Sequence, residues 1–242
     1  MSKSHIKRIA APRSWPIPRK KSKWITKPRP GPHSIDRSMP LSLILKDIIR
    51  LAENKREVKK ILYEGKILIN HIIRKDPKFP VGLMDTISIP SINKYYRILF
   101  NYKGQLVLHK INKSESNIKL SKIINKKILR GKKTQINLYD GYNKIVDKDH
   151  YKVGDSVLFD LEKNHIVEHL KLEKGAYVYL TNGKHIGTTG VIDKVLTSKG
   201  TYPSKIVFKK KNHSFETLKD YAFVIGKEKP LISLPEENEQ GK

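Results

Sequence analysis

The chain contains no cysteine, and acidic residues are scarce for its size. The lack of cysteine excludes disulfides, thiolate metal sites and a cysteine nucleophile, and it fits a reducing interior. The 242 residues carry 23 Asp and Glu against 50 Lys and Arg, which gives a formal net charge of +27. Because such an excess of one sign opposes compaction through self-repulsion, we expect a polyanionic partner to compensate it.

Long apolar runs are absent as well. No window of eighteen apolar residues occurs, and the N-terminus has no apolar segment followed by a small-residue cleavage site. A basic surface could still meet an anionic membrane, but that needs a cationic amphipathic helix, and five prolines between residues 12 and 30 break the basic segment. We therefore expect a cytoplasmic protein of two or three small domains, with no membrane partner.

Residues 1–37 form a basic arm without any hydrophobic period. Asp36 is its one acid, and Trp15 and Trp24 stand among its cations. Cations neutralise phosphates, and aromatic rings stack on unpaired bases, so we expect an RNA-binding arm that takes its order from a polyanion; a solvated disordered tail is the alternative. Besides the two tryptophans, the candidate RNA-binding residues are Lys3, Lys7, Arg8, Arg13, Arg19, Lys20, Lys21, Lys23, Lys27, Arg29 and Arg37.

Residues 38–92 predict a helix-hairpin module backed by a small sheet. A first helix is expected to open at residues 38–40 and to keep an apolar face as far as Ala52. A second helix follows, because Asn54 and Glu57 have the spacing of a capping box and Gly65 stands where a left-handed C-terminal cap belongs. Short strands are expected at residues 67–69, 72–73 and 86–89, with a proline-bearing loop over residues 76–82.

Basic side chains follow one face of the second helix and continue beyond it. They can converge on one side if the hairpin packs on its sheet, which would form a second RNA-binding surface. A solvated face, partly neutralised by Glu53 and Glu57, is the alternative. The candidates are Lys55, Arg56, Lys59, Lys60, Lys66, Arg74, Lys75 and Lys78.

From residue 93 onward, short strands alternate with turn signals such as Lys103-Gly104 and Asp140-Gly141. The pattern predicts a central barrel-like β domain over residues 93–172 and a small SH3-like barrel over residues 173–212. Residues 213–242 are expected to form a C-terminal segment with an acidic tail. The predicted fold class is α+β, mostly β.

Two motifs suggest chemistry, but a simpler structural interpretation of each is favoured. His165-Ile166-Val167-Glu168-His169 has the zinc pattern of one metalloprotease class, yet the pattern needs a helix, and on a strand the two histidines lie about 13 Å apart. Gly183, Gly187 and Gly190 are spaced closely enough to suggest a phosphate-binding loop, but the Lys-Ser or Lys-Thr and the long helix of a nucleotide P-loop are missing. We expect an edge strand and a tight turn presented to RNA or to a protein neighbour. No catalytic residue, metal, cofactor or small-molecule substrate is expected.

Four segments, in this order, resemble the archaeal and eukaryotic small-subunit ribosomal protein family S4e. Residues 5–20 (HIKRIAAPRSWPIPRK) and 27–33 (KPRPGPH) look like its N-terminal signature. Residues 75–85 (KDPKFPVGLMD) resemble the signature that closes its S4-type RNA-binding fold, and residues 175–192 resemble its KOW motif. Departures are small: Asn70-His71 stands at a strand turn where Gly or Asp is expected, and Tyr63 is large. The chain end soon after Ile232 is similar to the archaeal form.

The resemblance implies a structural, non-catalytic component of the small ribosomal subunit. It would bind small-subunit ribosomal RNA, with the arm threaded between RNA helices and the helix-hairpin module reading RNA shape, and it would contact neighbouring ribosomal proteins. The β domains would add RNA backbone contacts through Lys132, Lys133, Lys184, Lys209, Lys210 and Lys211. A free RNA-binding regulator and an RNA-modifying factor with an S4-type targeting domain are the alternatives.

Overall fold

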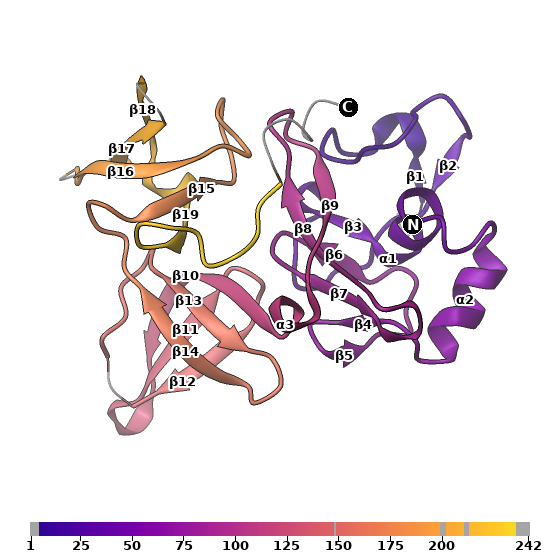
Figure 1. Cartoon of the computed structure of the whole chain (residues 1–242), viewed down its shortest axis with the longest axis horizontal. Coiled ribbons are helices and arrows are strands. Elements are labelled where there is room, and N and C mark those ends of the chain that lie inside the picture. The colour runs from indigo at the N-terminus through magenta and orange to yellow at the C-terminus, as the bar shows by residue number, and fades with distance from the viewer. Residues whose placement is uncertain (1–4, 148, 199–201, 211–212, 236–242) are drawn as a thin grey trace. The chain divides into compact units, whose positions relative to one another are not determined.

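The computed structural model describes residues 5–147, 149–198, 202–210 and 213–235 (Figure 1). The chain divides into two compact units, one made of residues 1–99 and 104–117 and the other of residues 100–103 and 118–242. Strands dominate both units, and the helices of the described residues are short. None of those helices has the length and the apolar character needed to span a bilayer.

The first helix of the first unit is shorter than expected. Residues 38–40 form strand β3 (Ser38–Pro40), which pairs with β6 (Pro80–Gly82) inside the expected loop. Helix α1 (Leu41–Leu43) continues into a π-helix, η3 (Ile44–Ile48), and Arg50, at φ 58°, follows it. The prediction of a regular helix from residue 38 to residue 52 is therefore wrong, because pairing with residues 80–82 holds its first residues extended.

Helix α2 (Lys55–Tyr63) confirms the predicted capping signals. The Asn54 Oδ1 accepts hydrogen bonds from the backbone N–H groups of Arg56 and Glu57, at 2.9 and 3.1 Å. The Glu57 carboxylate accepts from the backbone N–H of Glu53 at 2.8 Å. In a standard capping box this bond comes from the N-cap residue, here Asn54, so the bond is shifted by one residue toward the N-terminus. Gly65 has the expected left-handed conformation, with φ 71°.

A five-stranded antiparallel sheet backs these helices, in the order β5-β4-β7-β8-β9. The strands are β4 (Leu68–Ile69), β5 (Ile72–Ile73), β7 (Thr86–Ile89), β8 (Lys94–Phe100) and β9 (Leu106–Lys110). The turn between β4 and β5 has both Asn70 and His71 at positive φ, and the Asn70 amide steadies it by bonding Asp85 and the N–H of Thr86. Because β8 pairs with β7, the sheet continues across the boundary expected between residues 92 and 93.

The second unit contains two five-stranded antiparallel sheets. The first has the order β12-β11-β10-β13-β14, and its core is Ile123, Ile136, Leu138, Val157 and Phe159. The strands are β10 (Ile118–Ile128), β11 (Thr134–Leu138), β12 (Asn143–Val146), β13 (Ser156–Asp160) and β14 (His165–Leu170). The histidine-bearing segment at residues 165–170 is an edge strand, as predicted.

The other sheet of this unit has the order β18-β17-β16-β15-β19. Its strands are β15 (Tyr177–Leu180), β16 (Thr189–Leu196), β17 (Lys205–Lys210), β18 (His213–Leu218) and β19 (Ala222–Gly226), so it extends past the expected end at residue 212. Gly190 is required because a Cβ there would overlap the carbonyl of Lys209 on the neighbouring strand. The buried Lys122 amine donates to the carbonyls of Asp220 and Ala222, at 2.8 Å each, and thereby ties the two sheets together.

The first unit also contains a buried ion pair. The Arg97 guanidinium on β8 is fully buried and bonds the side chain and the carbonyl of Glu115, which belongs to helix α3 (Lys113–Ser116). Burial lowers the pKa of Arg97, and the Glu115 charge opposes that change.

Replacing Glu115 with alanine should destabilise the first unit by about 3–5 kcal/mol, because it leaves a buried guanidinium without its counter-charge. Urea unfolding followed by tryptophan fluorescence measures this, since both tryptophans of the chain lie in the first unit. Glu64→Ala is the control: Glu64 pairs with Lys66 at the surface, so its loss should leave the midpoint nearly unchanged. Equal midpoint shifts for both variants would contradict the prediction.

Candidate nucleic-acid interface

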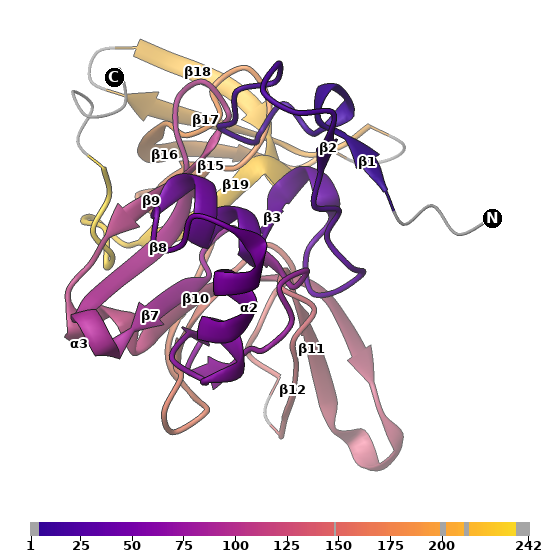
Figure 2. The same ribbon diagram turned by 90° about the vertical axis from the view of Figure 1, so that its right-hand side faces the viewer.

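The described part of the basic arm, residues 5–37, is folded onto the first unit (Figure 2). Strands β1 (Ile6–Lys7) and β2 (Trp24–Ile25) pair with each other. Between them, the Trp15 ring is 1% exposed, and its Nε1 donates to the carbonyl of Ser38 at 2.7 Å. The expectation that the arm owes its order to a polyanion is therefore wrong for these residues, because its apolar side chains pack on the protein itself.

The C-terminal end of the arm is fixed by His33. The His33 Nε2 lies 2.9 Å from Asp85 Oδ2, and each side chain is 1% exposed. The same carboxylate oxygen accepts from the N–H of Gly82 at 2.9 Å. A Cβ at Gly82 would overlap the imidazole, so glycine is needed here for the His33 side chain to occupy its buried position. Two of the motifs that carry the resemblance, residues 27–33 and 75–85, thus meet in one buried contact.

Two arginines of the arm hold its path together. Arg8 is buried; its Nε donates to Ser22 Oγ at 3.0 Å and its guanidinium lies 3.8 Å from the Asp47 carboxylate. The half-buried Arg19 donates to the carbonyls of Ile9, Ala11 and Pro12. The burial of Arg8 disagrees with its expected role at RNA phosphates. Several N–H donors of Arg19 bond backbone carbonyls of the arm itself.

The remaining cations of the arm are mostly at the surface. Lys27 and Arg37 are half-buried, and Lys3 lies outside the described residues. Arg29 is exposed and reaches the loop after β5: its guanidinium is 3.1 Å from Asp76, and its N–H donates to the carbonyl of Lys78 at 2.9 Å. The exposed cations are Lys7, Arg13, Lys20, Lys21, Lys23 and Arg29.

The two tryptophans occupy opposite environments. Trp15 cannot stack on a base, because both faces of its buried ring are covered by protein. Trp24 is 49% exposed, and its ring has His5 at a centroid distance of 5.6 Å and the Lys23 amine at 5.4 Å. The prediction for Trp15 is corrected accordingly, and Trp24 remains the stacking candidate of the arm.

Four predicted cations share the solvent side of α2. Lys55, Arg56, Lys59 and Lys60 are exposed, whereas Val58 and Leu62 of the same helix are buried. The exposed Lys66 lies 2.5 Å from Glu64 and lowers the pKa of that carboxyl through a hydrogen bond. Of the rest, Lys75 is exposed and Lys78 half-buried, while the Arg74 guanidinium stacks 4.5 Å from the Phe79 ring. The structure thus brings Lys78 to Arg29 of the arm, while the four α2 cations share one side of their helix.

The predicted cations of the second unit lie on its loops and strands. Lys133 and Lys184 are exposed, Lys209 is exposed and 3.2 Å from Asp193, and Lys210 is half-buried. The Lys132 side chain and Lys211 lie outside the described residues. Lys127 and Arg130 are exposed near Lys133 at the end of β10, but they were not among the predicted RNA-binding cations. The basic run Lys126-Lys127-Ile128-Leu129-Arg130 could have indicated them.

Three family descriptions match the chain. The profile described as ribosomal family S4e matches residues 92–166, the S4 domain matches residues 39–87, and the RS4NT (NUC023) domain matches residues 2–36.

Relatives match over nearly the whole chain. A small ribosomal subunit protein eS4 of Methanosphaera stadtmanae is 44% identical over 237 residues, which cover 98% of each chain. Its counterpart from Methanocella arvoryzae is 43% identical, covering 96% of this chain and 98% of the relative. The crystal structure of the 30S ribosomal protein S4e from Thermoplasma acidophilum, at 34% identity, covers 79% of this chain and 96% of that one with a TM-score of 0.69. This chain therefore belongs to ribosomal family S4e.

Proposed function

We propose that the chain is a structural constituent of the small ribosomal subunit in the cytoplasm, where it binds ribosomal RNA and neighbouring ribosomal proteins. The near full-length match to proteins named small ribosomal subunit protein eS4 carries this proposal. The exposed cations on the arm and on α2 support it physically, because they suit a phosphate backbone. The proposed role needs neither catalysis nor a cofactor.

The folded arm gives this binding a mechanism. Arg8, Arg19 and the buried Trp15 fix its path, so Lys20, Lys21 and Lys23 are presented from a framework that is already ordered. Less conformational entropy is then lost on binding than for a disordered tail. Each phosphate that a lysine neutralises releases counterions, so affinity should depend steeply on salt.

The α2 cations complement the arm. A-form RNA hides its base edges in a deep major groove, so a helix that presents Lys55, Arg56, Lys59 and Lys60 reads phosphate positions and groove shape rather than sequence. Lys78, whose carbonyl accepts from Arg29, and the exposed Lys75 extend the contact from the first unit.

The finer organisation of the β region belongs to the same proposal. We assign the KOW motif to residues 175–192 and a small SH3-like barrel to the sheet that ends at Gly226. The close approach of Gly190 to the Lys209 carbonyl supports this assignment. Lys133, Lys184, Lys209 and Lys210 then add backbone contacts. The acidic tail predicted after residue 235 lies outside the described residues.

Sedimentation tests the proposed function against a free regulator or an RNA-modifying factor. A tagged copy expressed in its own host should remain with small subunits washed at high salt, because many phosphate and protein contacts hold it. Recovery in light fractions after the wash, with intact subunits lacking the tagged copy, would overturn the structural role.

Replacing Lys20, Lys21 and Lys23 together with glutamine should lower the slope of log affinity against log salt for ribosomal RNA. The slope should decrease by about 0.9 for each duplex phosphate that the variant no longer neutralises. The matched control replaces Lys152, Lys163 and Lys174, which are exposed and outside the predicted interface, so it removes the same charge. An equal slope change in both triple variants would mean that net charge, not the arm surface, sets binding.

The two tryptophans should separate stability from RNA binding. Trp15→Ala should cost about 3–5 kcal/mol of the free energy of unfolding, because a buried indole leaves a cavity. Trp24→Ala should leave stability nearly unchanged and weaken RNA binding, because its exposed ring offers a stacking face. Urea unfolding followed by circular dichroism and RNA titration of each variant measure the two effects, and a stability loss confined to Trp24→Ala would refute the assignment.

A further inference from the structure

A row of aromatic rings runs from the core to the edge of the β15–β19 sheet. Phe208 on β17 is fully buried and lies directly opposite Phe215 on the edge strand β18, with ring centroids 5.6 Å apart. His185, from the loop before β16, lies 4.5 Å from Phe215, and His213 lies 6.2 Å from it. Phe215 and His185 are half-buried and His213 is exposed, so three of the four rings reach the surface.

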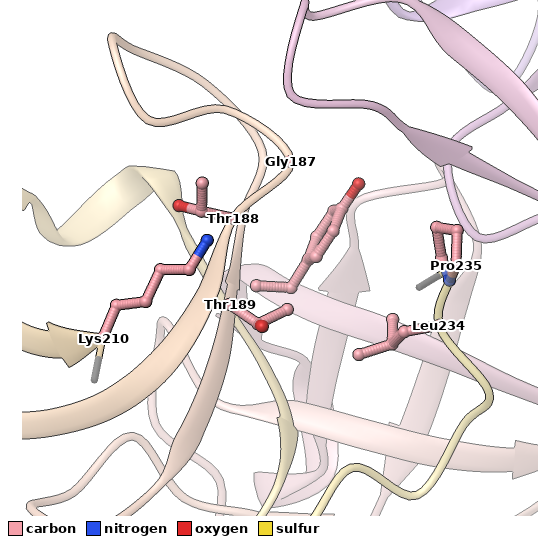
Figure 3. Close-up of a pocket in the computed structure, with 7 residues that line it drawn as sticks. Gly187, Thr188, Thr189, Lys210, Leu234 and Pro235 are labelled. Carbon is pink, nitrogen blue, oxygen red and sulfur yellow. The ribbon is translucent and has the colours of Figure 1, made fainter. Parts of the chain in front are cut away.

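A lysine stands at the exposed end of this row. Lys210 is the register partner of His213 and therefore shares its face of the sheet. It also lines a small pocket with Gly187, Thr188 and Thr189, and its side chain points toward Thr188 (Figure 3). The Thr188 hydroxyl donates to the carbonyl of His185 at 2.6 Å, which fixes the loop that carries the imidazole. Lys184, next to His185, is exposed.

The opposite face of the same strands carries two ion pairs. There Lys209 lies 3.2 Å from Asp193, and Lys205 lies 3.8 Å from Glu216, so the cations of that face have acidic neighbours. On the face of the rings, Lys210 lies opposite His213, and Leu234 and Pro235 line the same pocket as Lys210. Aromatic rings next to a cation suit a base and its phosphate.

We propose that this face binds an unpaired nucleotide of RNA, with the base stacked on Phe215 and the flanking imidazoles and the phosphate against Lys210 and Lys184. The inference rests on the proposed RNA-binding function and adds a base-contacting site to it. Every base has a π face, so the site selects unpaired nucleotides with little preference for sequence. His185, Phe208, His213 and Phe215 form the aromatic row. Through its rings at the surface, the aromatic row recognises single-stranded RNA.

The test uses the full-length protein and two RNA probes: a stem with a single-stranded extension of uridines, and the same stem without it. Phe215→Leu keeps the apolar volume but removes the ring, so the affinity gained from the extension should fall roughly five- to tenfold, with the stem alone unaffected. Tyr202→Leu is the matched control, because it removes an 81% exposed ring from the connection between β16 and β17. It should leave both affinities unchanged.

Salt dependence separates the ring from the cation. Lys210→Gln should lower the log–log salt slope for the extended probe by about 0.7, the value for one single-strand phosphate, whereas Phe215→Leu should lower affinity without changing the slope. His213→Ala, at an exposed position, provides a second ring variant in case Phe215→Leu perturbs folding. Unchanged affinity for the extended probe in a folded ring variant would overturn the proposal.

Crosslinking from 4-thiouridine in the extension locates the contact. Crosslinks should map to peptides that contain His185, His213 or Phe215 and should disappear in Phe215→Leu. Crosslinks to the arm alone would overturn this site while leaving the proposed function intact, whereas no RNA binding at all would overturn both. A crosslink in purified subunits that joins the aromatic row to a neighbouring protein in place of RNA would also overturn it.

Discussion

The buried contact between His33 and Asp85 is the constraint on which the first unit depends. It joins the end of a strongly basic arm to the connection between β6 and β7, and it needs Gly82 to leave room for the imidazole. Asp85 also holds the Asn70 amide of the β4–β5 turn, so one carboxylate organises the arm, the hairpin and the strand after it. A buried charge is tolerated only with such partners, which makes this a demanding arrangement.

Charge is distributed in two ways around this framework. Some cations are structural: Arg8, Arg97 and Lys122 are buried and bonded to the protein's own oxygens. Many others stand exposed on the arm, on α2 and at the β10–β11 end, where solvent or a polyanion must meet them. A net charge of +27 thus overstates the RNA-facing charge, because part of it holds the fold together.

The sequence predicted features that depend on local chemistry. The cap of α2, the glycine turns and most strands of the second unit follow from residues within a few positions of each other. Contacts between residues far apart in the sequence could not be predicted from it. Nothing local in the arm shows that Trp15 finds the Ser38 carbonyl or that His33 finds Asp85, and the lysines of β10 obscured the longest strand. For the candidate site, the exposure of most lysines was predictable, whereas the burial of Trp15 but not Trp24 and the pairing of Phe208 with Phe215 required the three-dimensional packing.

The contact between His33 and Asp85 can form only after both residues have been synthesised. Asp85 is translated 52 residues after His33, so at about 5–20 residues per second the arm waits roughly 3–10 s for its docking partner. In that interval the arm already has partners such as Ser38 and Asp47, but its C-terminal end lacks the carboxylate that holds His33. The C-terminal end of the arm can therefore dock only after residues 82–85 have emerged and folded.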